Sequence, residues 1–384
     1  RVRYNRLVGR SSAGVGSPAR LEDCDGHGTI NAHIVGGYND LPGFPHTDAA
    51  GYHYGLGLAP FVRVGSSVIF DPGFTYPDFA ELQSQAYHDG ARISCNSWGA
   101  ALPGDYNEEA QAFDALVRDA QPEGSPHPAP GNQEMVIVFS AGNSGPSSGT
   151  LGTPGTAKNV LTVGAAENVH PQGTADGCGT DDPAADNAED MAFFSSRGPC
   201  ADGRLKPDLV APGTHVTGGV PQSPAPGPLG QAAACFAATG VCALPSGGTP
   251  GNSNSFFPPG QQFYTTSSGT SHSCPAVGGG AALLRQWFLN HGWPPPSPAM
   301  TKAWLLNSAR YLTGAGANDT LPSRSQGMGA LDLGMAFDNT PRVARDQIAA
   351  DKFTASGQTR AFRGVIVHTN RPFRVTLAWT DAPG

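Results

Sequence analysis

A serine opens the strongest helix candidate of the chain, in the stretch Ser268-Gly269-Thr270-Ser271-His272-Ser273-Cys274-Pro275. The pattern predicts a helix over Ser271–Leu289, entered through Gly269-Thr270 and stopped by Asn290-His291-Gly292. The first N–H groups of a helix lack partners inside it, so beside a serine hydroxyl they can stabilise an oxyanion. A serine at this position is also an ordinary helix cap, so the residue alone does not decide its role.

Strands and helices alternate along the chain before this helix. Apolar spacing predicts helices over His27–Val35, Tyr76–His88 and Glu108–Ala120, and a further helix that starts at Ser297-Pro298 and ends at Ala309. Apolar and β-branched runs predict strands over Val62–Phe70, Ala91–Asn96, Met135–Ser140 and Val160–Ala166. This alternation is typical of an α/β fold with a mainly parallel sheet covered by helices on both faces.

The composition excludes several classes of protein. The chain has 384 residues, of which 39% are hydrophobic and 14% charged, so it can bury a sizeable core. The net charge is 23 − 31 = −8 without a basic block, which argues against nucleic acid as a partner. The longest apolar runs are far shorter than the ~20 residues that cross a bilayer, so we expect no membrane-spanning segment and a soluble chain.

The pattern of apolar and polar residues changes after about Phe337. Thr359–His368 and Phe373–Trp379 alternate apolar and polar residues, as half-buried antiparallel strands do. Because two or three strands are not stable alone in water, we expect these to begin a larger all-β domain in which the sequence is cut. The predicted domains are therefore residues 1–337 and 338–384.

Seven cysteines offer a choice of disulfides. Cys235 and Cys242, and also Cys178 and Cys200, lie in Gly/Pro-rich loops where a disulfide would be useful in an oxidising compartment. These loop cysteines and the low lysine content favour a secreted protein. Residues 221–259 are dense in Pro, Gly, Ser and Ala and are expected to form a surface insertion.

Two other segments place reactive groups beside small residues. Asp25-Gly26-His27-Gly28-Thr29 sets a histidine at a helix start, and Phe139-Ser140-Ala141-Gly142-Asn143-Ser144-Gly145 ends an apolar strand with an asparagine. Each has an ordinary interpretation as a turn. In the order His, Asn, Ser, on strand-to-helix junctions of one parallel sheet, they indicate a catalytic site.

These segments resemble the motifs of the subtilisin-like serine proteases, the subtilases, over nearly the whole chain. The resemblance includes His27-Gly28-Thr29, Ala141-Gly142-Asn143 and Gly269-Thr270-Ser271 through Pro275, with further blocks at Asn96–Gly99, Gly155–Asn159, Phe194–Pro199 and Lys206–Gly213. Gln326–Gly329 and Leu377–Gly384 most resemble the oxidatively stable alkaline subtilases, which carry a C-terminal β-barrel domain. The resemblance implies a three-layer subtilisin-like fold followed by the start of a jelly-roll-like domain.

The resemblance also implies roles for single residues. Ser271 would attack the scissile carbonyl, His27 would act as general base and acid, and Asn143 would bind the oxyanion. The substrate-binding residues would be Ser97, Trp98, Gly99, Ala141 and Gly142. The function implied is a serine endopeptidase that acts as a monomer on proteins or peptides and needs no cofactor for catalysis, with no charge from Ser144 in its specificity pocket.

The aspartate of the family's catalytic triad has no counterpart in the chain. It normally precedes the histidine by more than 26 residues, and the first aspartate here is Asp23. Asp23 and Asp25 lie too near His27 along the chain to replace it and are expected to have local turn or cap roles. We therefore expect the catalytic aspartate upstream of residue 1, and the fragment alone to be weakly active or inactive.

Two further features concern His272 and calcium. Relatives usually have methionine where His272 stands, and we expect its imidazole to neighbour the cleft rather than act as a second base. An acidic run from Asp176 to Asp190 suits a structural Ca²⁺, with Asp186 and Asp190 as ligands, although a solvated acidic loop is an equal alternative.

Two other functions are compatible with parts of the sequence. A protease-like binding module without catalysis would explain the absent aspartate, but His27, Asn143 and Ser271 argue against it. A lipase-type hydrolase would require a Gly-x-Ser-x-Gly elbow, and Ser271 does not lie in one.

Overall fold

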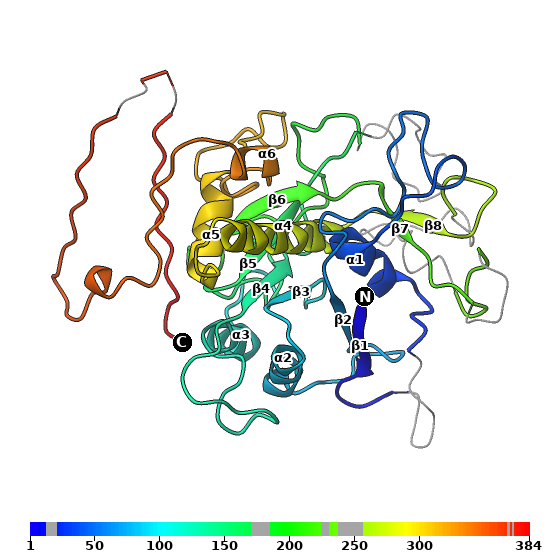
Figure 1. Cartoon of the computed structure of the whole chain (residues 1–384), viewed down its shortest axis with the longest axis horizontal. Coiled ribbons are helices and arrows are strands. Elements are labelled where there is room, and N and C mark those ends of the chain that lie inside the picture. The colour runs from blue at the N-terminus through cyan, green and yellow to red at the C-terminus, as the bar shows by residue number, and fades with distance from the viewer. Residues whose placement is uncertain (13–20, 170–184, 224–229, 237–255, 367–368, 371) are drawn as a thin grey trace.

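The computed structural model describes residues 1–12, 21–169, 185–223, 230–236, 256–366, 369–370 and 372–384 (Figure 1). The helices among them are α1 (His27–Gly36), α2 (Phe79–His88), α3 (Glu108–Arg118), α4 (Thr270–Asn290), α5 (Pro298–Asn307) and α6 (Leu333–Ala336), and a short 3-10 helix covers Ala349–Asp351. The strands are β1 (Val2–Leu7), β2 (Val64–Val68), β3 (Ile93–Asn96), β4 (Val136–Ser140), β5 (Leu161–Ala166), β6 (Leu209–Pro212), β7 (Val216–Gly219) and β8 (Tyr264–Ser267).

A four-stranded parallel sheet in the order β3-β4-β5-β6 forms the middle layer of the molecule. Every residue of β4 is buried, and its side chains alternate between two cores. Val136 and Val138 pack with residues of α1, α4 and α5, whereas Ile137 and Phe139 pack with residues of α2 and α3. Helices therefore cover both faces (Figure 1), which confirms the predicted α/β fold with three layers.

Helix α4 lies across the sheet and is buried along most of its first half. Glycines on this helix permit close packing: a Cβ on Gly278 would overlap the sulfur of Cys95 in β3, and one on Gly279 would crowd Leu58. The predicted helix over Ser271–Leu289 is confirmed, with one further residue at each end. Like every other helix that the structure describes, α4 lacks the combination of length and apolarity needed to cross a bilayer.

The other helices and strands predicted before residue 338 are also present, with ends that differ by a few residues. Four strands, β1, β6, β7 and β8, were not predicted. β1 pairs in parallel with β2, and β8 pairs with β7 in an antiparallel ladder. β8 has the polar sequence Tyr-Thr-Thr-Ser, so the sequence pattern gives no sign that all four residues are buried.

The described part of residues 338–384 does not contain the predicted β-strands. In the described parts of Thr359–His368 and Phe373–Trp379 no residue is assigned to a strand, and apolar side chains such as Phe373 and Leu377 are exposed. A strand needs neighbours that satisfy its backbone and cover its apolar face, and this structure provides none here. The two strand predictions are therefore wrong for this structure, while a β-domain from residue 338 onward stays a prediction.

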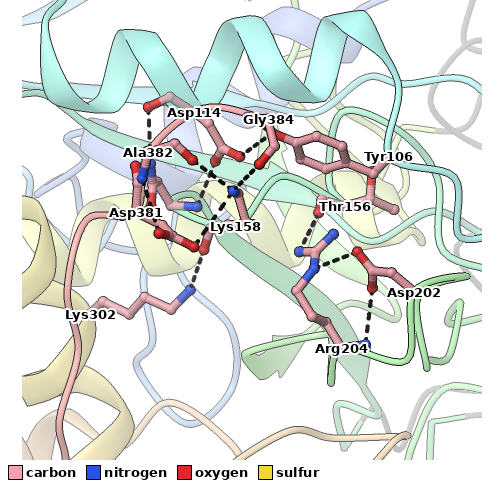
Figure 2. Close-up of polar contacts among 11 residues, drawn as sticks. Tyr106, Asp114, Thr156, Lys158, Asp202, Arg204, Lys302, Asp381, Ala382 and Gly384 are labelled. Carbon is pink, nitrogen blue, oxygen red and sulfur yellow. Dashed lines mark hydrogen bonds and ion pairs between the residues drawn. The ribbon is translucent and has the colours of Figure 1, made fainter. Parts of the chain in front are cut away.

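The end of the chain instead folds back against residues near α3 (Figure 2). The Asn159 side chain forms two hydrogen bonds with the backbone of Asp381, one accepted from its N–H at 2.7 Å and one donated to its carbonyl at 2.9 Å. Lys158 donates to the carbonyls of Ala382 and Gly384, at 2.7 Å each. We call Lys158 and Asn159 the C-terminal clasp.

Within the described residues, a disulfide joins Cys24 to Cys235, which are 211 residues apart in sequence. The predicted bond between Cys235 and Cys242 is wrong, because Cys235 already pairs with Cys24. The predicted bond between Cys178 and Cys200 is also wrong, because Cys200 is a buried free thiol. Cys178 and Cys242 themselves, and most of the predicted 221–259 insertion, lie outside the described residues.

The segment Lys206-Pro207-Asp208 contributes two charged side chains to a buried ion cluster. Asp208 accepts hydrogen bonds from Lys206 Nζ at 2.6 Å and from the Thr162 N–H at 2.8 Å, and its other oxygen lies 2.8 Å from Lys302 Nζ. Burial lowers the pKa of Lys206 to about 8 against the attraction of Asp208. Burial alone would raise the pKa of Asp208, but the two lysine charges lower it overall.

We predict that Asp208→Ala destabilises the chain by about 3–5 kcal/mol, because it leaves a buried ammonium without its counterion. The free energy of unfolding in urea checks this. Asp202→Ala is the matched control, since Asp202 pairs with Arg204 near the surface and its loss should cost less than about 1 kcal/mol. Equal effects of the two substitutions would contradict the assignment.

We also predict that Asn159→Ala releases the C-terminal segment. Losing the paired hydrogen bonds to Asp381 should cost about 1–2 kcal/mol and make proteolytic cleavage within residues 338–384 about 5- to 30-fold faster. Limited proteolysis followed by mass spectrometry measures this. Gln358→Ala serves as control, because Gln358 bonds only locally with Thr354. Unchanged cleavage in Asn159→Ala would show that the clasp does not hold the segment.

Candidate active site

Ser271 is the second residue of α4. The turn before it depends on Gly269, whose φ of 156° favours glycine. The Ser271 hydroxyl donates to the carbonyl of Ser97 at 3.4 Å, and the Ser97 hydroxyl donates to the carbonyl of Ser271 at 2.6 Å. This reciprocal pair ties the first turn of α4 to the residue that follows β3.

Asn143 lies after β4 and points toward the same helix end. Its side-chain oxygen accepts hydrogen bonds from both the N–H and the hydroxyl of Thr270, at 2.9 Å each. Because the oxygen is occupied in this way, the amide nitrogen is the end left to donate to a ligand. Thr270, which orients Asn143, was not predicted as a site residue, although its place beside Ser271 was a usable signal.

Asn143 and Ser271 line one cleft of about 230 Å³. The predicted substrate-binding residues Ser97, Trp98, Gly99 and Gly142 also line it, together with Ala100, Ala101, Ser140, Ser144, Thr150, Gly152 and Thr270. No charged side chain is among these residues. The cleft is therefore walled by small or neutral side chains.

Ala141 is placed differently from its predicted role. Its side chain is buried with Leu151 and Cys200 and does not line the cleft. Its N–H donates to Val163 and its carbonyl accepts from Gly152, so both backbone groups are already used. In this structure Ala141 anchors the strand end rather than contacting the cleft.

His27 begins α1, on the other side of the α4 terminus. Its ring lies 5.7 Å from the ring of His272, the residue after Ser271, and its backbone N–H donates to Asp25 at 3.0 Å. The structure thus brings His27 to the helix end that carries Ser271, although His27 does not line the 230 Å³ cleft. Burial lowers the pKa of the His27 imidazole, and the charge of Asp25 offsets this only partly.

Asp23 and Asp25 have the local roles expected of them. Asp23 accepts a hydrogen bond from the N–H of Thr29 in the first turn of α1, and Asp25 accepts from the N–H of His27. Burial, followed by a hydrogen bond to Asp25, raises the pKa of Asp23 to about 6. Both carboxylates bond to the open N–H groups at the start of α1.

His272 is more deeply buried than its predicted place beside the cleft suggests. It is 1% exposed, and both ring nitrogens have partners: Nδ1 lies 2.8 Å from Asn31 Oδ1, and Nε2 lies 2.7 Å from the Ser267 hydroxyl. Burial, and then the nearby His27, lowers the pKa of His272 well below 6.5. The ring is therefore a neutral part of the core.

The residues predicted to bind calcium lie in a short loop. Asp190 accepts hydrogen bonds from the N–H groups of Gly316 and Met191, at 2.8 and 2.7 Å, so it already holds that loop in place. Among the described residues, no three acidic, histidine or cysteine ligand atoms converge around Asp186 and Asp190. Asp176, Asp181 and Asp182 lie outside the described residues. The arrangement does not by itself fit a calcium site, and structural calcium stays a prediction.

The chain is similar to known proteins in sequence and in fold. Residues 6–329 match the family described as "Subtilase family". A serine protease/ABC transporter B family protein, tagD of Dictyostelium discoideum, is 25% identical over 81% of this chain and 19% of its own length. The serine protease AprX of Bacillus subtilis (strain 168) is 34% identical over 32% of this chain and 23% of its own length.

A solved structure supports the fold alone. The prenylagaramide maturation protease PagA is 22% identical, with a TM-score of 0.50 over 86% of this chain and 90% of that one. This chain spans about a fifth of the length of the curated relatives it matches. The family match covers most of the residues, from β1 to the segment before α6, and on this evidence the chain belongs to the subtilase family.

Proposed function

We propose that this chain is part of a serine endopeptidase in which Ser271 is the nucleophile. The observation that carries the proposal is the pairing at the start of α4. Ser271 lies in the first turn of the helix, and Asn143 lines the same cleft. Because the side-chain oxygen of Asn143 accepts hydrogen bonds from Thr270, its amide nitrogen is left to donate to a ligand. A nucleophile beside two kinds of N–H donor is the arrangement that acyl transfer needs.

The reaction follows from these groups. Ser271 Oγ attacks the scissile carbonyl while its proton passes to His27, which then delivers it to the leaving amine. The Asn143 amide and the Ser271 backbone N–H bind the oxyanion of the tetrahedral intermediate. A water molecule, deprotonated by His27, hydrolyses the acyl-enzyme. Burial supports this role of His27, because a lowered pKa keeps the imidazole neutral and able to accept a proton.

The carboxylate that orients His27 is proposed to lie outside residues 1–384. Asp23 and Asp25 bond to the backbone at the start of α1, and neither is seen to bond the ring of His27 among the described contacts. Without such a carboxylate the tautomer of the imidazole is poorly controlled, so these residues alone should have weak activity. The sequence upstream of residue 1, searched for Asp followed by Thr-Gly or Ser-Gly after a strand, tests this point.

The substrate is proposed to be an extended protein or peptide segment. Ser97, Trp98 and Gly99 border the cleft at the end of β3, where a peptide can pair with exposed backbone. Ser144, Thr150 and Gly152 add no charge, which favours an apolar or aromatic side chain at P1. The Cys24–Cys235 disulfide supports the further proposal of a secreted protein, since such bonds persist in oxidising compartments.

The function is tested with a fluorophosphonate probe on the full-length protein. We predict a covalent adduct on Ser271, found by peptide mass spectrometry, and no adduct in Ser271→Ala or His27→Ala. The probe reacts only with a serine that a base activates, so it separates the protease from a binding module of the same fold. A folded full-length protein without an adduct at Ser271 would refute the proposal and favour the binding module.

We predict that Asn143→Asp lowers kcat on a peptide substrate about 10²- to 10³-fold with little change in KM, a magnitude established for the oxyanion asparagine of subtilisin itself. The substitution keeps the size of the side chain and removes its N–H donors. Asn187→Ala is the control, because Asn187 caps a loop at Glu189 and should leave kcat unchanged. A loss expressed mainly in KM would place Asn143 in substrate binding instead.

A further inference from the structure

The segment Asp381–Gly384 is held mainly through its main chain. The clasp residues Lys158 and Asn159 bond to its backbone, and the Tyr106 hydroxyl accepts a further hydrogen bond from the N–H of Gly384 at 3.2 Å (Figure 2). These contacts use N–H and carbonyl groups, which an extended chain presents at regular intervals. The surface made by Tyr106, Lys158 and Asn159 therefore fits one extended segment, and we call it the docking surface.

The ammonium group of Lys158 finds its partners in the docked segment. The side chain is 17% exposed, Nζ donates to the carbonyls of Ala382 and Gly384 at 2.7 Å each, and the Asp381 carboxylate lies 3.5 Å away. A partly buried ammonium that lost these acceptors would lose part of its compensation for leaving water. The charge of Lys158 therefore favours the docked state of the segment over its release.

The docking surface lies a short way along the chain from both segments that border the cleft. Residues 97–101 line the cleft, and the chain reaches Tyr106 a few residues further on. Thr150 and Gly152 also line the cleft, and the chain leads from them to the clasp. Both borders of the cleft are thus continuous in sequence with the docking surface.

The two borders are joined to each other at two places inside the protein. Near the cleft, the N–H and carbonyl groups of Ala100 pair with those of Thr153, at 2.9 and 3.1 Å. At the docking surface, the buried carboxylate of Asp114 in α3 accepts from the Tyr106 hydroxyl and from the Asn159 N–H, at 2.7 Å each. These links set the spacing of the two borders.

The docked segment adds a further link on the solvent side. Gly384 bonds to Tyr106 and Asp381 bonds to Asn159, so the segment spans the ends of both borders. Asp114 joins the same two ends from the interior, whereas the Asp381 side chain is 50% exposed. A spacing that is fixed from two sides varies less than one fixed from one side, and a substrate that binds between fixed borders has less to order.

We propose that the docking surface binds the extended segment Asp381–Gly384 of the same chain, and that this docking fixes the spacing of the two cleft borders for an extended substrate. The proposal rests on the proposed function, because it assigns to the segment a role in substrate binding. The segment contacts neither Ser271 nor Asn143 in this scheme. Its docking therefore affects the affinity for extended substrates rather than the chemistry at Ser271.

The test uses the full-length protein with Lys158→Met, Asn159→Ala and the double variant Lys158→Met/Asn159→Ala. The first substitution keeps the length of the side chain and removes its ammonium group. Lys352→Met is the matched control, because Lys352 is an exposed lysine of the 338–384 stretch outside the docking surface. Two quantities are measured on each variant that a thermal melt shows to be folded: kcat and KM on a peptide that spans the cleft, and the rate of fluorophosphonate labelling at Ser271.

We expect the double variant to raise KM about 5- to 10-fold with kcat unchanged, because a less fixed cleft binds the ground state and the transition state less tightly to the same extent. Labelling should be unchanged, since the small probe needs Ser271 and the groups that activate it but not the outer borders. Each single variant should act in the same direction and by less. Lys352→Met should leave all three quantities unchanged.

Hydrogen exchange measured by mass spectrometry gives a readout that does not depend on activity. It compares Ser271→Ala with and without the two docking-surface substitutions, so that self-cleavage cannot interfere. We expect faster exchange in the docked segment, and also in residues 97–107 and 150–157, when the docking surface is changed.

A segment that stays protected in the double variant would overturn the docking surface. A released segment with unchanged KM, or labelling that slows as much as KM rises, would overturn the role in substrate binding. The failure of the proposed function looks different, because the wild-type protein then neither turns over the peptide nor reacts with the probe. In that case the exchange of the two cleft borders still decides whether docking holds them.

Discussion

The start of α4 is a helix terminus that the fold buries, and its polar groups must find partners inside the protein. A helix leaves its first N–H groups unpaired, and water can supply partners only where the terminus is open. Here the N–H of Thr270 bonds to Asn143, and Ser271 and Ser97 exchange hydrogen bonds. These contacts hold the residues that follow β3 and β4 against one helix turn. The shape of the cleft is therefore a consequence of how this terminus is satisfied.

Many of the helices and strands could be predicted because each of them carries its apolar pattern within one continuous stretch of sequence. β4 is apolar throughout, and the long helix behind Ser271 follows the expected pattern. β8 could not be predicted, because its buried residues are polar and find their partners far away in sequence. The strands expected after residue 338 show the converse: Phe373–Trp379 has the alternation of a strand, but alternation gives a structure only where another strand or a core covers the apolar face.

The same distinction applies to the candidate site. His27, Asn143 and Ser271 stand in local motifs, so the sequence indicates each of them. Their supporting residues are visible only in three dimensions: nothing local links Cys24 to Cys235, 211 residues away, or Asn31 to His272. Asp190 shows a contact that the sequence pattern does not contain. An acidic residue among other acidic residues suggests a metal ligand, yet its carboxylate is bonded to backbone N–H groups of its own and a neighbouring loop.

Two buried polar clusters offset the desolvation cost of polar groups in the core in different ways. Lys206, Asp208 and Lys302 bury full charges, which is tolerable because the charges lie within hydrogen-bond distance of one another. The groups around His272 remain neutral, so they avoid most of the desolvation cost and depend on hydrogen bonds alone. A neutral network has a property that an ion cluster lacks: its donors and acceptors can exchange roles without moving charge. In the proposed function the imidazole of His27 first accepts a proton and then donates it, and that property suits the neutral cluster to its neighbourhood, whereas the charged cluster suits the sheet.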